Sequence, residues 1–204
     1  MTEAEWRGTT NVAGMLAFLQ GKASDRKFRL FAVACSRGAL GRWADEPGQL
    51  WDGTLEVAER YADGAATEPE REGTAEVTFI ESADDPGSTP HVFHALGPDA
   101  YFAATMASEY AGQIEGGSDL QPAMLRDIFG DPFGPVPADP RWLTSAAVTL
   151  ARSMYDSRDF APMPVLADAL EEAGCDNPDV LAHCRGPGPH VRGCWVVDLI
   201  LGKN

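Results

Sequence analysis

Residues 163–202 have the sequence MPVLADALEEAGCDNPDVLAHCRGPGPHVRGCWVVDLILG, and this stretch carries the clearest helix start and stop signals in the chain. Proline lies near the start of three successive segments, at Pro164, Pro178 and Pro189. Glycine follows each segment, as is typical of the C-terminal end of a helix. The pattern therefore predicts three short helices joined by tight turns.

The last of these segments, His190 to Leu201, is apolar on nearly every side. A helix without a polar face is normally surrounded by other elements of the protein. We therefore expect the C-terminal helix to be buried in the core.

Helical spacing of apolar residues extends through most of the remaining chain. Val12, Met15 and Leu19 recur at intervals of three and four, which is typical of an amphipathic helix. One short stretch, Glu76 to Ile80, has the composition of a β-strand. Further helices are predicted at residues 24–41, 52–63, 98–110, 120–129 and 144–156. The sequence thus predicts a mainly α protein.

Residues 130–140, GDPFGPVPADP, contain four prolines. Such a segment cannot sustain a helix, because each proline lacks the backbone N–H that the helix needs. We expect an extended strap that is anchored by Phe133, Val136 and Trp142. The predicted fold is therefore a compact multi-helix domain with a proline-rich strap and a buried C-terminal helix.

The composition predicts three regions along the chain. Residues 1–64 hold the N-terminal helices, and residues 97–204 form a C-terminal helical region that packs on them as one core. Residues 65–96 lie between these regions and are rich in Glu, Thr, Asp, Gly, Ser and Pro. This composition is typical of an acidic, partly helical and partly flexible insertion.

The chain is strongly acidic, with 31 acidic and 16 basic residues and a formal net charge of -15. This excess disfavours direct nucleic-acid binding, which needs clustered Lys and Arg, and it disfavours binding to anionic membranes. It is typical of a solvated acidic surface, or of a surface that meets a basic partner.

The chain has no apolar run near the roughly 20 residues that a membrane-spanning helix needs. Its first residues, MTEAEW, lack the positive charge and the apolar segment of a signal peptide. We therefore expect a cytoplasmic protein without a membrane association. Its four cysteines would then be reduced rather than joined in a disulfide framework.

Three of the four cysteines and two of the four histidines lie between positions 175 and 194. A possible structural zinc is the one cofactor that this block suggests, with Cys175, Cys184, His190 and Cys194 as ligands and His183 as a spare. On the last predicted helix, His190 and Cys194 would lie one turn apart on the same face. Two further thiolates would then complete a tetrahedral site.

Two other interpretations of the block remain open. Cysteine is among the most frequently buried residue types, so the thiols can simply pack between helices. Alternatively, Cys184 can be a reactive thiol, because His183 and Arg185 beside it favour the thiolate. The predicted position of Cys184 at a helix C-terminus opposes that thiolate.

The chain resembles a large paralogous family of uncharacterised bacterial helical proteins with no known activity. The matching segments are MTEAEW, MLAFLQGKASDRKFRLFAVAC, EVAERYADG, LRDIFGDPF and PVLADALEEAGCDNPDVLAHCRGPGPHVRGCWVVDLILGK, the last of which contains the HCRGPGPHVRGCW motif. The resemblance implies a recurring helical module, and it supports a recognition or regulatory role over catalysis. Ser36 follows Cys35 where relatives are expected to carry a second cysteine, which argues against a metal role for Cys35.

The sequence contains no nucleotide-binding, nucleophile-elbow or metalloprotease motif. The expected function is therefore a non-catalytic protein-interaction or accessory module with a protein partner. One alternative is a zinc-stabilised helical domain in a regulatory complex. The other is a cysteine-dependent enzyme that is centred on Cys184.

Overall fold

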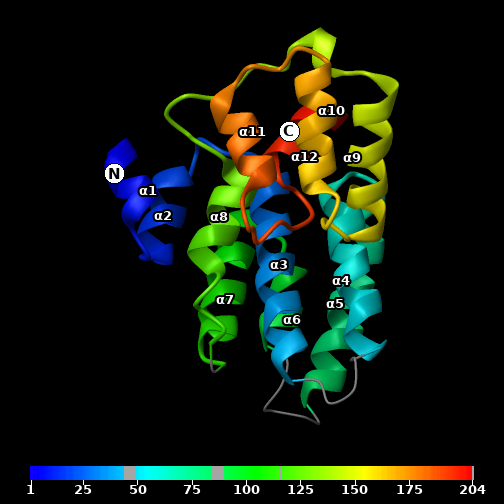
Figure 1. Ribbon diagram of the computed structural model, residues 1–204. Coiled ribbons are helices and arrows are strands. Elements are labelled where there is room, and N and C mark those ends of the chain that lie inside the picture. Colours follow the sequence, from blue (N-terminus) through cyan, green and yellow to red (C-terminus); the bar gives the residue numbers. More distant parts are fainter. Residues whose placement is uncertain (44–48, 84–89, 115, 204) are drawn as a thin grey trace. The chain divides into compact units, whose positions relative to one another are not determined.

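The computed structural model describes residues 1–43, 49–83, 90–114 and 116–203 (Figure 1). Within these ranges the chain is mainly α, as predicted, with one short 3-10 helix at Pro140–Trp142 and no β-strand. The helices are α1 (Glu3–Gly8), α2 (Val12–Leu19), α3 (Asp25–Trp43), α4 (Gln49–Ala62), α5 (Glu68–Ala83), α6 (Pro90–Ala95), α7 (Ala100–Gly112), α8 (Gln121–Phe129), α9 (Ser145–Ser157), α10 (Met163–Glu172), α11 (Pro178–Arg185) and α12 (Trp195–Leu201). Among the described residues, no helix combines the length and the apolarity needed to span a bilayer.

The chain forms two compact units, one from Met1 to Leu125 and a second that begins at Arg126. Residues 97–125 therefore belong to the first unit, whereas the sequence had grouped them with the rest of residues 97–204. Helix α8 contains the division between the two units. Because each unit has its own buried apolar cluster, we describe each by itself.

Helix α3 is the centre of the first unit, where it packs against α4, α6 and α7. Its residues Phe28, Phe31 and Cys35 recur at helical spacing and are all buried. Helix α7 meets α3 through a row of small side chains that includes Ala103 and Ala107, both fully buried. Small residues allow two helix backbones to approach closely, which explains why this alanine-rich helix lies in the core.

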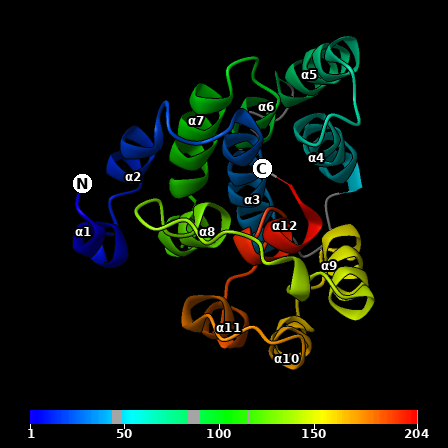
Figure 2. The same cartoon turned by 90° about the horizontal axis from the view of Figure 1, so that it is seen from above.

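The acidic segment 65–96 is largely helical and belongs to the first unit. It forms α5 and α6, and α6 packs against α7, α3, α4 and α5. Figure 2 shows α6 between α5 and α7. The stretch from Glu76 to Ile80, considered above as a strand, lies inside α5. The flexible part expected within residues 65–96 is not tested at residues 84–89, which lie outside the described residues.

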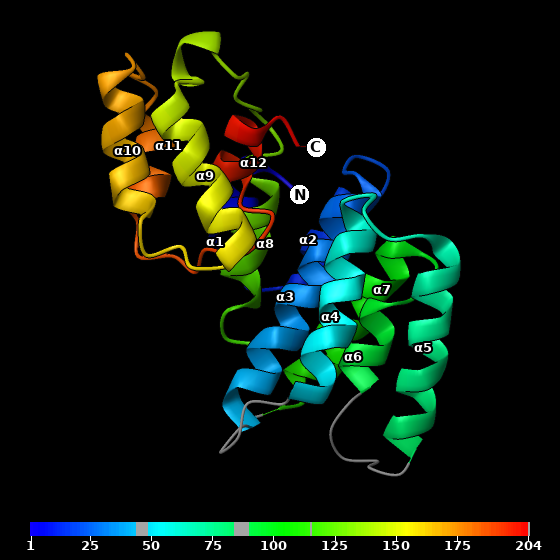
Figure 3. The same ribbon diagram turned by 90° about the vertical axis from the view of Figure 1, so that its right-hand side faces the viewer.

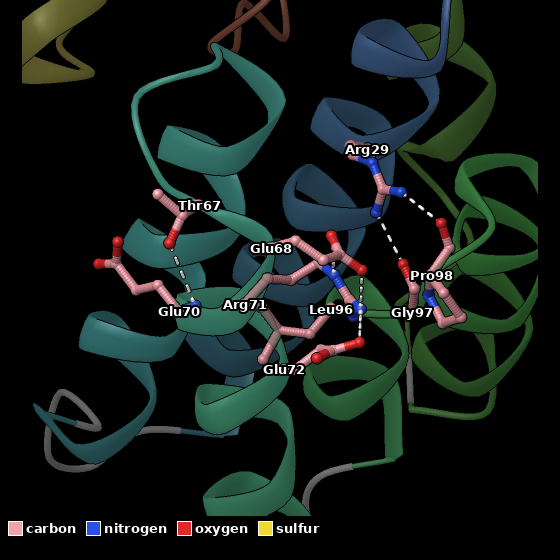
Figure 4. Close-up of polar contacts among 9 residues, drawn as sticks. All are labelled: Arg29, Thr67, Glu68, Glu70, Arg71, Glu72, Leu96, Gly97 and Pro98. Carbon is pink, nitrogen blue, oxygen red and sulfur yellow. Dashed lines mark hydrogen bonds and ion pairs between the residues drawn. The ribbon is translucent and has the colours of Figure 1, made fainter.

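Two arginines hold the turn between α6 and α7 (Figure 4). Arg29 donates hydrogen bonds to the carbonyl oxygens of Gly97 at 2.7 Å and Pro98 at 2.6 Å. Arg71, which is 4% exposed, donates to the carbonyl oxygen of Leu96. Buried carbonyl groups need such partners, since an unsatisfied one costs about 1–3 kcal/mol.

An aromatic ring and a carboxylate complete this network. The guanidinium groups of Arg29 and Arg71 lie over the Tyr61 ring, at 4.8 and 5.6 Å from its centroid. Glu68 accepts two hydrogen bonds from Arg71, at 2.6 and 3.1 Å. The hydrogen bonds from Arg71 and Tyr61 lower the pKa of Glu68 to about 2.

Helices α9 to α12 form the second unit as a ring of neighbours (Figure 3). Helix α9 contacts α10 and α12, α10 contacts α11, and α11 contacts α12. Trp142 is buried in the cluster between them, and Val136 packs against it, so two of the three predicted strap anchors are confirmed. Phe133 is 40% exposed and does not anchor the strap as expected.

The C-terminal helix is buried, as predicted, but it is shorter than the sequence suggested. Helix α12 begins at Trp195, with Cys194 as its N-cap, so residues 190–194 lie outside the helix. Gly193 has a φ of +97°, a conformation that is incompatible with a continuing right-handed helix. The expectation that His190 and Cys194 share one helical face is therefore wrong.

Candidate metal centre

Asp127 is a buried carboxylate in the last turn of α8, with 2% of the residue exposed. Its Oδ1 atom lies 2.9 Å from His190 Nδ1 and 3.1 Å from His183 Nε2. Its Oδ2 atom accepts a hydrogen bond of 2.9 Å from the backbone N–H of Val191. The side chain thus joins α8 to α11 and to the loop before α12.

Cys194 completes the group from the start of α12. Its Sγ atom lies 3.2 Å from Nε2 of His183, and the residue is fully buried. The rings of His183 and His190 meet edge to face, with centroids 4.9 Å apart. One ligand atom from each of Asp127, His183, His190 and Cys194 can be chosen so that all four lie within 4.8 Å of one another.

Local structure explains how α11 and the loop after it bring the two histidines together. Asn177 caps the start of α11 by accepting hydrogen bonds from the N–H groups of Asp179 and Val180. His183 lies in the last turn of this helix, which ends at Arg185. The chain then returns through a loop rich in glycine and proline, which carries His190 back beside His183.

A close packing contact between Gly130 and Trp195 lies beside the cluster. Gly130, which follows α8, has a φ of +65°, and a β-carbon there would lie 3.1 Å from the Trp195 ring. The same indole ring packs against His183, with centroids 5.2 Å apart. The end of α8, which carries Asp127, is therefore held directly against the start of α12, which carries Cys194.

The Asp127 carboxylate and the protonated His190 ring stabilise each other. Burial raises the pKa of Asp127, but hydrogen bonds from His183, His190 and the Val191 N–H outweigh it, so this pKa is lowered overall. Burial likewise lowers the pKa of His190, but the hydrogen bond and charge of Asp127 outweigh it and raise this pKa. The carboxylate therefore favours a positive charge in its surroundings.

The Cys194 thiol experiences the opposite effect. Burial and the nearby Asp127 carboxylate raise the pKa of Cys194 well above its usual range. A divalent cation would reverse this effect, because a coordinated thiol is deprotonated. The cluster therefore holds two groups, a carboxylate and a thiol, that a bound cation would stabilise together.

The cluster agrees with the predicted metal ligands only in part. His190 and Cys194 belong to it, and His183, the expected spare, takes part directly. Cys175 and Cys184 are buried in the apolar cluster of the second unit and are not members of the group. Cys184 is the next residue after His183 on α11, so it projects to a different side of the helix.

Asp127 is the member of the cluster that sequence reasoning missed. It lies 63 residues before His190, in the segment LRDIFGDPF, and no histidine or cysteine is near it in the sequence. Its role depends on a long-range contact that no local spacing rule reveals.

The ligand atoms suit zinc in type and in spacing. Zinc binds Cys sulfur, His nitrogen and Asp oxygen in a tetrahedron, with bonds of roughly 2.0–2.3 Å. Two nitrogen or oxygen ligands of such a site lie about 3.3 Å apart by tetrahedral geometry. The oxygen–nitrogen contacts of 2.9 and 3.1 Å are close to this value, and all four ligand atoms lie within 4.8 Å of one another, so the side chains would have to move for all four to bind one ion.

The geometry gives no support to a nucleophilic Cys184. The side chain is fully buried, and burial, together with the neighbouring Cys175, raises the pKa of Cys184 to about 12. At neutral pH the group is a neutral thiol, which is a poor nucleophile.

Comparison of the chain with family models, curated proteins and solved structures finds no match.

Proposed function

We propose that this chain is a non-catalytic accessory module whose second unit is a zinc-stabilised helical domain. The observation that carries the proposal is the convergence of four ligand atoms, from Asp127, His183, His190 and Cys194, within 4.8 Å. Zinc would supply a fixed positive charge that binds the carboxylate, the thiolate and the two imidazoles at once.

A structural role is favoured over a catalytic one by the number and burial of the ligands. Structural zinc sites have four protein ligands, whereas catalytic sites usually have three and keep one position open for water. Here the protein offers four, and Asp127 and Cys194 are 2% and 0% exposed. Such a site has no position at which a substrate would meet the ion.

The ligands come from segments that are far apart in the sequence. Asp127 lies at the end of α8, His183 in α11, His190 in the following loop and Cys194 at the N-cap of α12. An ion bound to all four would cross-link these segments and stabilise the second unit against unfolding. Burial at such a site is typical of metals that contribute directly to folding.

Elemental analysis of protein purified without chelator is the direct test. We expect about one zinc per chain for the unmodified protein, as for a closed four-ligand site. The Cys194→Ser and Asp127→Asn variants should bind zinc at least about 100-fold more weakly, because each removes a ligand.

Cys184→Ser is the matched control, because Cys184 is equally buried in the same unit but lies outside the cluster. It should retain about one zinc per chain. Less than about a tenth of a zinc per chain in the unmodified protein would falsify the proposal. If Cys184→Ser and Cys194→Ser lost bound zinc equally, that result would also contradict the ligand assignment.

The cysteine-enzyme alternative has its own experiment. With a pKa of about 12, the Cys184 thiol should react with iodoacetamide at least about 100-fold more slowly than free cysteine near neutral pH. Denaturation should abolish this protection. Rapid labelling of the folded protein at Cys184 would revive the enzyme hypothesis.

A further inference from the structure

Helix α5 exposes large apolar side chains alongside its acidic ones. Among its residues 68–80, the buried side chains are Arg71 and Thr78, and the Thr78 hydroxyl donates a hydrogen bond of 2.8 Å to the Thr74 carbonyl oxygen. The exposed side chains include Val77, Phe79 and Ile80, which are 53%, 60% and 60% exposed. The large apolar side chains of an amphipathic helix normally face the core, so this exposed set is unusual for a surface helix.

The exposed apolar side chains continue onto α6 and α7. The Phe79 ring contacts Phe93 at 5.5 Å between centroids, Phe93 contacts His94 at 5.4 Å, and His94 contacts Phe102 at 6.3 Å. Phe102 is itself 53% exposed. We call Phe79, Ile80, Phe93, His94 and Phe102 the aromatic face.

The aromatic rings of this face are in contact with one another rather than scattered singly over the surface. Phe79 and Phe102 together expose about 200 Å², taking about 150–250 Å² for each whole phenylalanine side chain. Ile80, which follows Phe79 on α5, adds further exposed apolar area.

Acidic side chains lie beside the aromatic face on both α5 and α7. Glu76 precedes Phe79 and Ile80 by three and four residues, and Glu109 follows Phe102 by seven, so each shares a side of its helix with them. Glu76 on α5 and Glu109 on α7 are both exposed. A partner that covers this surface must therefore bring its own positive charge.

We propose that the aromatic face binds a basic amphipathic helix of a protein partner. The apolar side of such a helix would cover Phe79, Ile80 and Phe102, and its Lys or Arg side chains would pair with Glu76 and Glu109. Arginine and lysine also bind favourably over aromatic rings. The mode is that of a helix laid on an apolar surface, with residues at intervals of three and four as anchors.

The same charges disfavour two other occupants. A second copy of the chain would bring two acidic surfaces together, since each carries a net charge of -15. An anionic membrane would be repelled for the same reason. The aromatic face lies wholly in the first unit, so this proposal does not depend on the zinc site of the second.

Fluorescence anisotropy with a designed probe tests the proposal. The probe is a fluorescein-labelled helical peptide of about 18 residues, five turns, with Leu on one side and Lys on the other. Its counterpart carries Glu in place of Lys. We expect the Lys peptide to bind the full chain at least about tenfold more tightly than the Glu peptide, with an affinity that falls as salt is added.

Variants of the face distinguish specific docking from general attraction to an acidic protein. Phe79→Gln/Ile80→Gln on α5 and, separately, Phe102→Gln on α7 should weaken binding at least about tenfold. Val165→Gln on α10, which removes a side chain that is 54% exposed, should leave binding unchanged. Circular dichroism checks that each variant is folded. Because the two variants alter different helices, the test still holds if one of the variants fails to fold.

Three results would overturn the proposal. The first is equal binding of the Lys peptide by the unmodified protein and by both variants of the face. The second is equal binding of the Lys and Glu peptides. The third is a dimer in light scattering that both variants dissociate, because the occupant would then be a second copy of the chain.

Discussion

The two units stabilise buried polar groups in different ways. In the first unit, Arg29 and Arg71 bring permanent positive charges from the chain itself, and they satisfy the carbonyl groups of residues 96–98. In the second unit, the Asp127 carboxylate and the Cys194 thiol are buried together with two histidines, and these groups converge on a common point. The first unit thus satisfies its buried carbonyl groups with its own cations, whereas the second buries a carboxylate and a thiol for which we propose a bound zinc ion.

Removing zinc should produce the largest difference in stability between the two units. Chelation should destabilise the second unit by about 4 kcal/mol when free zinc had been 1,000-fold above its Kd, and it should spare the first unit. Hydrogen exchange measured along the chain distinguishes the two regions. Equal loss of protection in residues 1–125 and 126–203 would contradict the comparison.

Replacing Arg71, a buried cation of the first unit, should have the next largest effect on stability. Arg71→Met removes the hydrogen bond that the buried Arg71 donates to the Leu96 carbonyl oxygen, which should cost about 1–3 kcal/mol of unfolding free energy. The loss should be the same with and without zinc. Urea unfolding measures it, and Arg141→Met, which alters a side chain that is 73% exposed, should leave the free energy of unfolding nearly unchanged.

The alkylation rates of buried cysteines provide a third comparison of the two units. Cys35 in the first unit and Cys194 in the second are both buried, and burial raises the pKa of each thiol. Chelation should accelerate alkylation of Cys194 at least about tenfold through local opening of the second unit. Mass spectrometry should show no change at Cys35, and equal acceleration at both sites would count against a local metal effect.

The smallest expected effect concerns pH and the first unit. The pKa of Glu68 is lowered to about 2 by hydrogen bonds from Arg71 and Tyr61, so its contribution to stability is present above pH 4.5, its ordinary pKa. That contribution should be lost as pH falls through about 2. The stability difference between the unmodified protein and Glu68→Gln, measured by urea unfolding, should therefore narrow in acid. A constant difference would show that the Arg71–Glu68 pair contributes nothing.

Much of the fold could be predicted because helix signals are local. The cap at Asn177, the start at Pro178 and the stop at Gly202 are encoded within a few residues of each helix end, and all three are observed. The last helix was predicted too long because its apolar composition gave no sign of the turn at Gly193. That glycine adopts a φ that a right-handed helix does not allow.

The metal cluster could be predicted only in part for the same reason. His183, His190 and Cys194 lie within one short stretch, so their residue types and proximity suggested a metal. The choice among neighbouring cysteines depended on which side of α11 faces Asp127, and periodicity alone did not reveal that. Asp127 itself was missed because 63 residues separate it from His190.

By itself, the sequence determined the helical class, most helix ends, the acidic charge and the concentration of Cys and His near the C-terminus. The tertiary structure decided where the two units divide, which four side chains converge, and that α5 exposes Phe79 and Ile80. The physical reason is the distance along the sequence between the residues that interact. Capping and periodicity depend on residues within about one helical turn, whereas a metal site or an exposed face depends on contacts between distant segments.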